Sequence, residues 1–151
     1  MSGNIEALSE GAKISTAITP TAGVAAASDL NGTILDMQGY DGVLVIVRMG
    51  AITASAVTSV KMQQDTASGG GTMADLTGTG ITVADDDDDQ TFFIDLVKPQ
   101  ERYVRVVVER ATQNAVVASA NYIQYIARDT NITQGTGVTG EVHITPIEGT
   151  A

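Results

Sequence analysis

The sequence contains no cysteine, no tryptophan and only one histidine among its 151 residues. The absence of cysteine excludes disulfide bonds, thiolate zinc sites and cysteine nucleophiles. The single histidine, His143, excludes a metal site built from several histidines. Aromatic residues make up only 4% of the chain, so its core has to be built mainly from aliphatic side chains.

Basic residues are also scarce, because eight Lys and Arg stand against eighteen Asp and Glu and leave a net charge of −10. A chain with this charge repels phosphate backbones, so nucleic acid is not expected as a direct partner. Residues 1–16 lack the basic and apolar regions of a secretory signal. No apolar run approaches the roughly 18 residues that a membrane span requires, so no membrane partner is expected. We expect a soluble protein that is synthesised in a cytoplasm.

The apolar residues that are present form 43% of the chain and are mostly Val, Ile and Ala, accompanied by 16 Gly. Branched side chains suit a pleated strand, and glycine suits tight turns. Patterns typical of strands recur along the whole chain, with turn residues between them. They span residues 13–23, 32–37, 40–50, 56–65, 81–84, 90–99, 102–111 and 115–128.

Seven or eight short strands of this kind predict an all-β fold, which we expect to be an antiparallel β-sandwich or jelly-roll-like single domain over residues 14–128. Residues 1–13 and 129–151 are polar and are expected to be an N-terminal and a C-terminal arm. Ordering a residue costs about 1–2 kcal/mol, so an ordered arm has to pack on a neighbouring surface. Ile144 and Ile147 are the expected anchors of the C-terminal arm.

The strand predicted at 40–50 is apolar on both faces, because Val43, Val45 and Val47 alternate with Leu44 and Ile46. A strand of this kind is central in its sheet, with its second face covered by another sheet or by another subunit. The double-sided apolarity therefore predicts that the protein associates with itself.

Alternation along the strands also predicts which side chains form the core. Phe93, Asp95 and Val97 share one face of their strand, opposite the face that we expect to be buried. If Asp95 faces inward, it is expected to pair with Arg102 or Arg105. The residues expected in the core are Val45, Phe92, Ile94 and Val106.

Five consecutive aspartates, 85–89, precede the apolar segment at 90–99. Calcium needs about six to eight oxygen ligands that fold around the ion, whereas successive side chains of an extended segment point to opposite faces. Asp85, Asp87 and Asp89 are the candidate residues for a metal site. The pattern favours a solvated β-turn, because aspartate tolerates turn conformations and a run of charge discourages wrong edge pairing.

The chain lacks the patterns of known catalytic sites. There is no G-x-S-x-G elbow, and S-G-G-G-T at 68–72 lacks the G-K-[ST] ending of a phosphate-binding loop. Apart from Asp95, no carboxylate lies in the apolar context that would raise its pKa for acid catalysis. We therefore expect no enzymatic activity and no cofactor.

Three short motifs lie in the later part of the chain: P-x-x-R-Y-V-R at 99–105, N-A-V at 114–116 and I-Q-Y-x-x-R at 123–128. Together with G-Y-D-G-V-L-V-I-V-R-M-G at 39–50, they resemble the strands of small structural proteins from tailed-phage heads, of the decoration or cement kind. The resemblance covers roughly residues 33–128, and its motifs are strand patterns without catalytic residues. The aspartate run and the long C-terminal tail depart from the family.

The resemblance implies a protein that binds the major capsid protein on the outside of an icosahedral phage head and stabilises the capsid. It implies a location on the virion exterior. A trimer is the favoured oligomer and a dimer the alternative, because capsids offer three-fold and two-fold positions. The candidates for contact with the capsid or with another subunit are Leu44, Ile46, Tyr103, Arg105, Ile144 and Ile147.

Two other kinds of phage structural protein are alternatives. A head–tail connector or completion protein differs from a decoration protein mainly in its copy number. A fibre-type receptor-binding module is also rich in β-strands, but it usually belongs to a longer chain with internal repeats, and this sequence has none.

Overall fold

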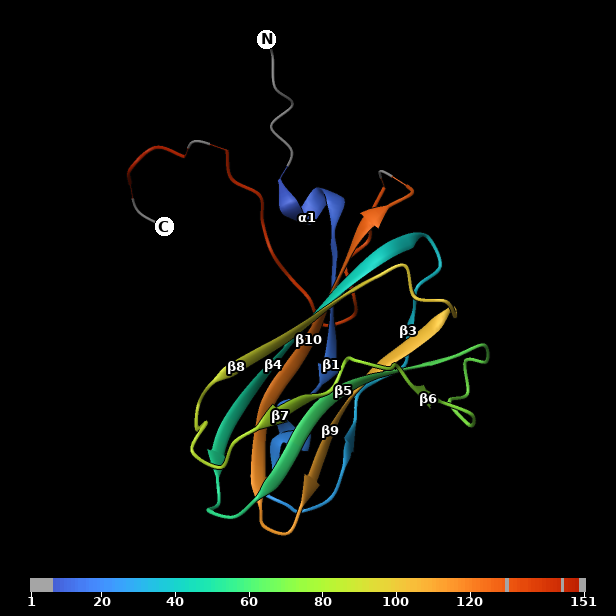
Figure 1. Ribbon diagram of the computed structural model, residues 1–151. Coiled ribbons are helices and arrows are strands. Elements are labelled where there is room, and N and C mark those ends of the chain that lie inside the picture. Colours follow the sequence, from blue (N-terminus) through green and yellow to red (C-terminus); the bar gives the residue numbers. More distant parts are fainter. Residues whose placement is uncertain (1–6, 130, 145, 150–151) are drawn as a thin grey trace.

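Figure 1 shows the computed structural model of the chain, which describes residues 7–129, 131–144 and 146–149. A short α-helix, α1 (Leu8–Gly11), precedes the first strand, and a 3₁₀ helix, η1 (Pro20–Gly23), follows it. The strands are β1 (Lys13–Ile18), β2 (Leu30–Asn31), β3 (Leu35–Asp36), β4 (Tyr40–Ile52), β5 (Val57–Asp65), β6 (Ala74–Asp75), β7 (Ile81–Val83), β8 (Thr91–Val97), β9 (Tyr103–Ala111) and β10 (Ala115–Ala127).

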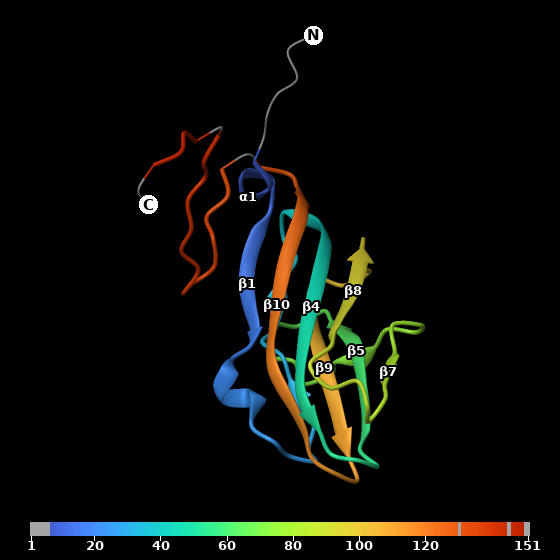
Figure 2. The ribbon, with the colours of Figure 1, turned by 90° about the vertical axis from the view of Figure 1, so that its left-hand side faces the viewer.

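The strands pair in an antiparallel manner and form two sheets. Sheet A has the order β1-β10-β4-β8, and sheet B has the order β2-β9-β5-β6, with β3 also paired to β9 and β7 to β5. Figure 2 shows the strands of sheet A side by side, with sheet B behind them. The prediction of an all-β fold with antiparallel sheets is confirmed, and each strand segment predicted between residues 13 and 128 contains a strand. The sequence also suggests a short strand at 141–147, and the described residues of that segment form none. In the described ranges, neither helix has the length and apolarity to cross a membrane.

The hydrophobic core lies between the two sheets and takes side chains from both of them. Val45, Ile94 and Val106 are buried as predicted. The prediction that Phe92 is buried is wrong, because its side chain is only partly buried against the core. The reason is that β8 lies at the edge of sheet A. Truncating Phe92 should therefore cost less than the about 3–5 kcal/mol lost at a buried phenylalanine.

Tyr122 of β10 connects the two sheets through the core. Its side chain is fully buried, and its hydroxyl donates a hydrogen bond to the Thr33 carbonyl (2.9 Å) and accepts one from the Val106 N–H of β9 (2.9 Å). Burial raises the pKa of Tyr122, so the phenol stays protonated. Gly32 lies against this hydroxyl, since a Cβ at that position would come within 2.8 Å of it. The bridge therefore satisfies buried polar groups of both sheets.

Arg110 of β9 is a buried cation that ties a loop to the sheets. Its guanidinium donates hydrogen bonds to the carbonyls of Ser28 (2.7 Å), Val24 (2.8 Å) and Ala115 (2.8 Å). Burial lowers the pKa of Arg110. Carbonyl oxygens offset the cost of burying the charge, and they fix the segment 24–29 against the start of β10.

Replacing Tyr122 with Phe is expected to lower the free energy of unfolding by about 1–3 kcal/mol, because the buried Val106 N–H loses its acceptor. Chemical denaturation measures the change. Tyr40→Phe is the matched control, since the Tyr40 hydroxyl makes no hydrogen bond to any described residue, and it should shift the free energy by less than about 0.5 kcal/mol. Equal denaturation midpoints for Tyr122→Phe and the wild type would contradict the bridging role.

Candidate interaction surfaces

The face of sheet A that is turned away from the core carries a group of apolar side chains. The strand registers place Ile123 of β10 beside Leu44 of β4, and Ile46 of β4 beside Phe93 of β8. Val97 lies further along β8 on the same face. We call Leu44, Ile46, Phe93, Val97 and Ile123 the outer patch. Phe93 is 65% exposed and Val97 52% exposed, so the edge of this patch at β8 is open to solvent.

Tyr125 crosses the same face and explains the glycine at position 42. A Cβ at Gly42 would come within 2.5 Å of the Tyr125 ring, so the ring lies directly on the β4 backbone. The Tyr125 hydroxyl donates a hydrogen bond to the Asp95 carboxylate. Burial and the neighbouring carboxylate raise the pKa of Tyr125 to about 12. Asp95 is thus exposed on the outward face, and the pairing expected for an inward-facing Asp95 does not arise.

The outward face of sheet B is polar, and its side chains bind one another. Lys61 forms ion pairs with Asp75 (2.8 Å) and Glu109 (2.5 Å). These pairs hold the pKa of both carboxyls below their usual values and raise the pKa of Lys61. Gln63 donates to Asp75 (2.7 Å) and accepts from Arg105 Nε (2.8 Å). A face whose polar groups satisfy one another is suited to solvent, in contrast to the outer patch.

The structure distributes the six predicted contact residues over three places: Leu44, Ile46, Tyr103, Arg105, Ile144 and Ile147. Leu44 and Ile46 belong to the outer patch. Tyr103 and Arg105 alternate with the buried valines of β9 and face outward from sheet B. There the Arg102 guanidinium lies 5.2 Å from the centre of the Tyr103 ring. Ile144 and Ile147 belong to the C-terminal segment, where Ile144 is 62% and Ile147 94% exposed. The six therefore do not form one surface.

The predicted contact residues omit Phe93, Val97 and Ile123, which complete the outer patch. A signal for two of them is present in the sequence, because Phe93 and Val97 alternate with the core residues of their strand. Their neighbours, however, are fixed by the registers between β8, β4 and β10. Side-chain alternation within one strand does not reveal the register between two strands.

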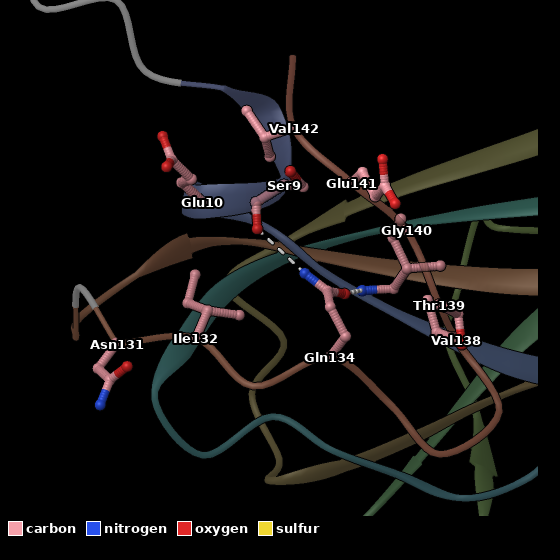
Figure 3. Close-up of a pocket in the computed structure, with 11 residues that line it drawn as sticks. Ser9, Glu10, Asn131, Ile132, Gln134, Val138, Thr139, Gly140, Glu141 and Val142 are labelled. Atoms are coloured by element: carbon pink, nitrogen blue, oxygen red, sulfur yellow. Dashed lines mark hydrogen bonds between the residues drawn. The ribbon is translucent and has the colours of Figure 1, made fainter. Parts of the chain in front are cut away.

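The C-terminal segment returns to β1 and occupies its free edge. The Gln134 side chain accepts a hydrogen bond from the Ile14 N–H (2.7 Å) and donates to the carbonyls of Ser9 (3.0 Å) and Ala12 (2.9 Å) (Figure 3). The Gly135 N–H donates to the Ile14 carbonyl (3.0 Å). A Cβ at Gly135 would lie 2.7 Å from that carbonyl oxygen, so the approach requires glycine. The C-terminal segment therefore binds both backbone groups of Ile14 in β1.

An open groove of about 580 Å³ lies between α1 and the C-terminal segment (Figure 3). Its lining mixes apolar side chains such as Ile132 and Val142 with the carboxylates of Glu10 and Glu141. The nearby His143 places Nε2 2.8 Å from Glu141 Oε2, and both side chains are exposed.

The aspartate run joins β7 to β8 and is hydrogen-bonded to the end of the neighbouring β4. Asp88 Oδ1 accepts a hydrogen bond from the Ile52 N–H, and Asp85 Oδ2 accepts one from the Ser55 N–H, both at 2.6 Å. Ser55 has a φ of 69°, in the turn that follows β4. The carboxylates therefore provide acceptors for backbone N–H groups where the strand pairing ends.

The three candidate metal ligands have separate surroundings. The Asp85 carboxylate binds the turn after β4, and the Asp87 carboxylate binds the Ala84 N–H in its own turn at 2.9 Å. Asp89 has a φ of 59°, and its N–H donates to the Gly50 carbonyl (3.2 Å). Among the residues described, no three His, Cys, Asp or Glu side chains are grouped to hold a metal ion. The run forms turns at 85–86 and 88–89, as the sequence indicates.

Cations gather at the opposite end of β8. Arg102 forms an ion pair with Asp36 (2.7 Å), which lowers the pKa of that carboxyl, and Arg128 pairs with Asp41. Lys98 lines the same open depression of about 620 Å³ and forms no ion pair with a described residue. β8 therefore begins at the aspartate run and ends at Lys98, beside cations that are already paired with carboxylates of the same chain.

The chain was compared with protein families, curated proteins and solved structures. No protein-family model matches the chain, and no curated protein matches it in sequence. Among solved structures, the PBSX exported protein XepA has a similar fold, with a TM-score of 0.50 and 13% sequence identity. The match covers 95% of this chain and 46% of XepA, so the chain spans about half the length of that protein. At this identity the likeness concerns the fold alone.

Replacing Asp88 with Ala is expected to lower the free energy of unfolding by about 1 kcal/mol, because the partly buried Ile52 N–H loses its acceptor. Asp86→Ala is the matched control within the same run, since the Asp86 carboxylate accepts no hydrogen bond from a described residue. Its effect should stay within about 0.5 kcal/mol. Thermal and chemical unfolding of both variants measure the difference, and equal stabilities would contradict the role of Asp88.

Proposed function

We propose that the chain is a non-enzymatic structural protein of a phage virion, which binds the outer surface of an icosahedral capsid and stabilises it. In this proposal the two sheets form a β-sandwich, of the sandwich or jelly-roll kind that decoration proteins have. The partners are the major capsid protein and other copies of the chain, and the location is the exterior of the virion.

The observation that carries the proposal is the contrast between the two outward faces. Sheet B presents ion pairs and hydrogen bonds that are satisfied within the chain. Sheet A presents the outer patch, and the C-terminal segment runs beside β1 at the other edge of the sheet (Figure 2). In that segment Ile144 and Ile147 are exposed. Exposed apolar side chains gathered in this way mark surfaces that contact other proteins. A protein that coats a shell needs such a surface on one side and a solvated surface on the other.

Two likenesses support a phage protein. XepA, whose fold is similar, is a phage PBSX exported protein. The motifs that resemble decoration proteins lie on two long strands of the fold, since R-Y-V-R at 102–105 opens β9 of sheet B and I-Q-Y-x-x-R at 123–128 ends β10 of sheet A. The net charge of −10 is compatible with the outside of a capsid and unfavourable for contact with the packaged DNA.

The alternatives are a head–tail connector or completion protein and a fibre-type receptor-binding protein. Quantitative mass spectrometry of purified virions distinguishes them by copy number. Decoration of a whole shell requires hundreds of copies, whereas a connector ring has about a dozen, because each follows the symmetry of its position.

Replacing both Ile144 and Ile147 with Ser is expected to weaken binding to phage heads at least tenfold. Burying one isoleucine in a contact contributes about 1.5–3 kcal/mol, and about 1.4 kcal/mol corresponds to a factor of ten in affinity. The measurement is co-sedimentation of the purified protein with heads that lack it, prepared from the phage that encodes the chain. Val24→Ser is the matched control, because Val24 is 66% exposed on a different loop.

The two parts of this test have separate outcomes. Wild-type protein that does not bind the heads would contradict the proposed function. Wild-type binding that is unchanged in the Ile144→Ser and Ile147→Ser double variant would contradict only the contribution of the C-terminal segment.

A further inference from the structure

β8 is an open edge of sheet A. It pairs with β4 and with no other described strand. At one end of this pairing the Met49 N–H donates to the Gln90 carbonyl (2.9 Å), and at the other the Lys98 N–H donates to the Asp41 carbonyl (2.6 Å). Backbone groups of successive residues in an antiparallel strand point to opposite sides. The even-numbered residues from 90 to 98 therefore face β4, and Thr91, Phe93, Asp95 and Val97 direct their N–H and C=O groups away from the sheet.

The other edge of sheet A is covered, which makes the openness of β8 distinctive. Gln134 and Gly135 bind the N–H and C=O groups of Ile14 in β1. β8 has no such cover in the described chain, and no bulge interrupts its register with β4. It also exposes Phe93 and Val97 beside the unpaired backbone groups. An exposed edge strand with apolar side chains is a template for pairing with another strand.

We propose that β8 pairs antiparallel with β8 of a second copy of this chain, across a two-fold axis that passes beside Phe93. The two copies of sheet A then form one continuous sheet. Pairing over residues 91–95 supplies about six backbone hydrogen bonds between the copies. The two Phe93 side chains meet on the outward face at the axis, so the outer patches of both copies join.

The charges of the chain select this register. Arg48 forms no ion pair with a described residue, and its Nη1 lies 3.4 Å from Thr91 Oγ1, at the open edge of the sheet. With the axis beside Phe93, Thr91 lies opposite Asp95 of the second copy, so Arg48 meets that carboxylate. Moving the axis to Asp95 would place the two Asp95 side chains opposite each other, and like charges in that position destabilise a sheet.

The ends of β8 are complementary in the same register. Lys98, which forms no ion pair within the described chain, follows the last residue of β8 and lies on the side where the aspartate run of the second copy precedes its β8. Because the two-fold axis repeats this arrangement, each copy places its Lys98 toward the aspartate run of the other. The complementary ends offset part of the repulsion between two chains that each carry a charge of −10.

This inference concerns the free protein and does not rest on binding to a capsid. It favours the dimer, which the sequence leaves as the alternative to a trimer. Failure to bind phage heads would leave the β8 contact intact, and failure to dimerise would leave the proposed capsid contact of the C-terminal segment intact.

The absence of cysteine allows a direct test by single-cysteine cross-linking of the full chain. Phe93→Cys is expected to give a disulfide-linked dimer under mild oxidation, because the two positions face each other at the axis. Val97→Cys is the matched control on the same strand and face. Its two copies would lie about 27 Å apart, at roughly 3.4 Å per residue. Cross-linking of both variants to the same extent, or of Val97→Cys alone, would overturn the proposed register.

Sedimentation velocity over a range of concentrations tests the association itself. The wild type is expected to dimerise, and Phe93→Lys, which brings two like charges to the axis, should weaken the dimer at least tenfold. Val57→Lys, at a residue that is 62% exposed in sheet B, is the control and should dimerise like the wild type. Far-UV circular dichroism spectra that match the wild-type spectrum confirm that both variants are folded, whereas the melting temperature itself depends on dimerisation. A wild type that stays monomeric at several hundred micromolar would overturn the proposal.

A charge exchange tests the contact between Arg48 and Asp95. Arg48→Glu should weaken the dimer, and adding Asp95→Lys to the same chain should restore it. Within one copy the two residues are separated by about 13 Å along the strands, at roughly 3.4 Å per residue, so rescue has to arise between copies. Arg48→Glu without effect, or a double variant no better than the single one, would contradict the contact.

Discussion

The structure depends on β4, a central strand with apolar side chains on both faces. Only one face of a sheet can pack against the second sheet of the same chain. Val43, Val45 and Val47 take the inner face and are almost completely buried, and this contact organises the core around them. Leu44 and Ile46 are left on the outer face, where they join Phe93 and Ile123 instead of a layer of polar side chains. The apolar outer face of sheet A therefore follows from the composition of a single strand.

The two edges of sheet A differ in whether another segment of the described chain covers them. The β1 edge is covered by Gln134 and Gly135 of the C-terminal segment, in a contact so close that a side chain at position 135 would collide with the backbone. The β8 edge ends the sheet without a cover among the described residues. In the proposed dimer a two-fold contact uses the open edge of both partners, so the pairing closes after one additional copy. Such a contact would leave no open β8 edge for further growth along the sheet.

Much of this fold follows from local patterns in the sequence. Alternation of apolar residues predicts the long strands, and it identifies Val45, Ile94 and Val106 as core residues. It fails at Phe92, because partial burial there follows from the edge position of β8, which depends on strand order. The bridge made by Tyr122 and the acceptors supplied by Asp85 and Asp88 depend on residues that are distant in sequence. The predicted contact residues are scattered over both sheets for the same reason, since register and strand order decide which outward side chains become neighbours.

Hydrogen exchange of individual β8 amides, followed by NMR at low and high protein concentration, tests the central claim most directly. The Phe93 and Asp95 amides face the open edge, whereas the Phe92 and Ile94 amides face β4. The account predicts that exchange at Phe93 and Asp95 slows by about tenfold or more as the concentration rises, while exchange at Phe92 and Ile94 is slow throughout. Rapid exchange at Phe93 and Asp95 at every concentration would show that the edge of sheet A stays unpaired, and would contradict the account.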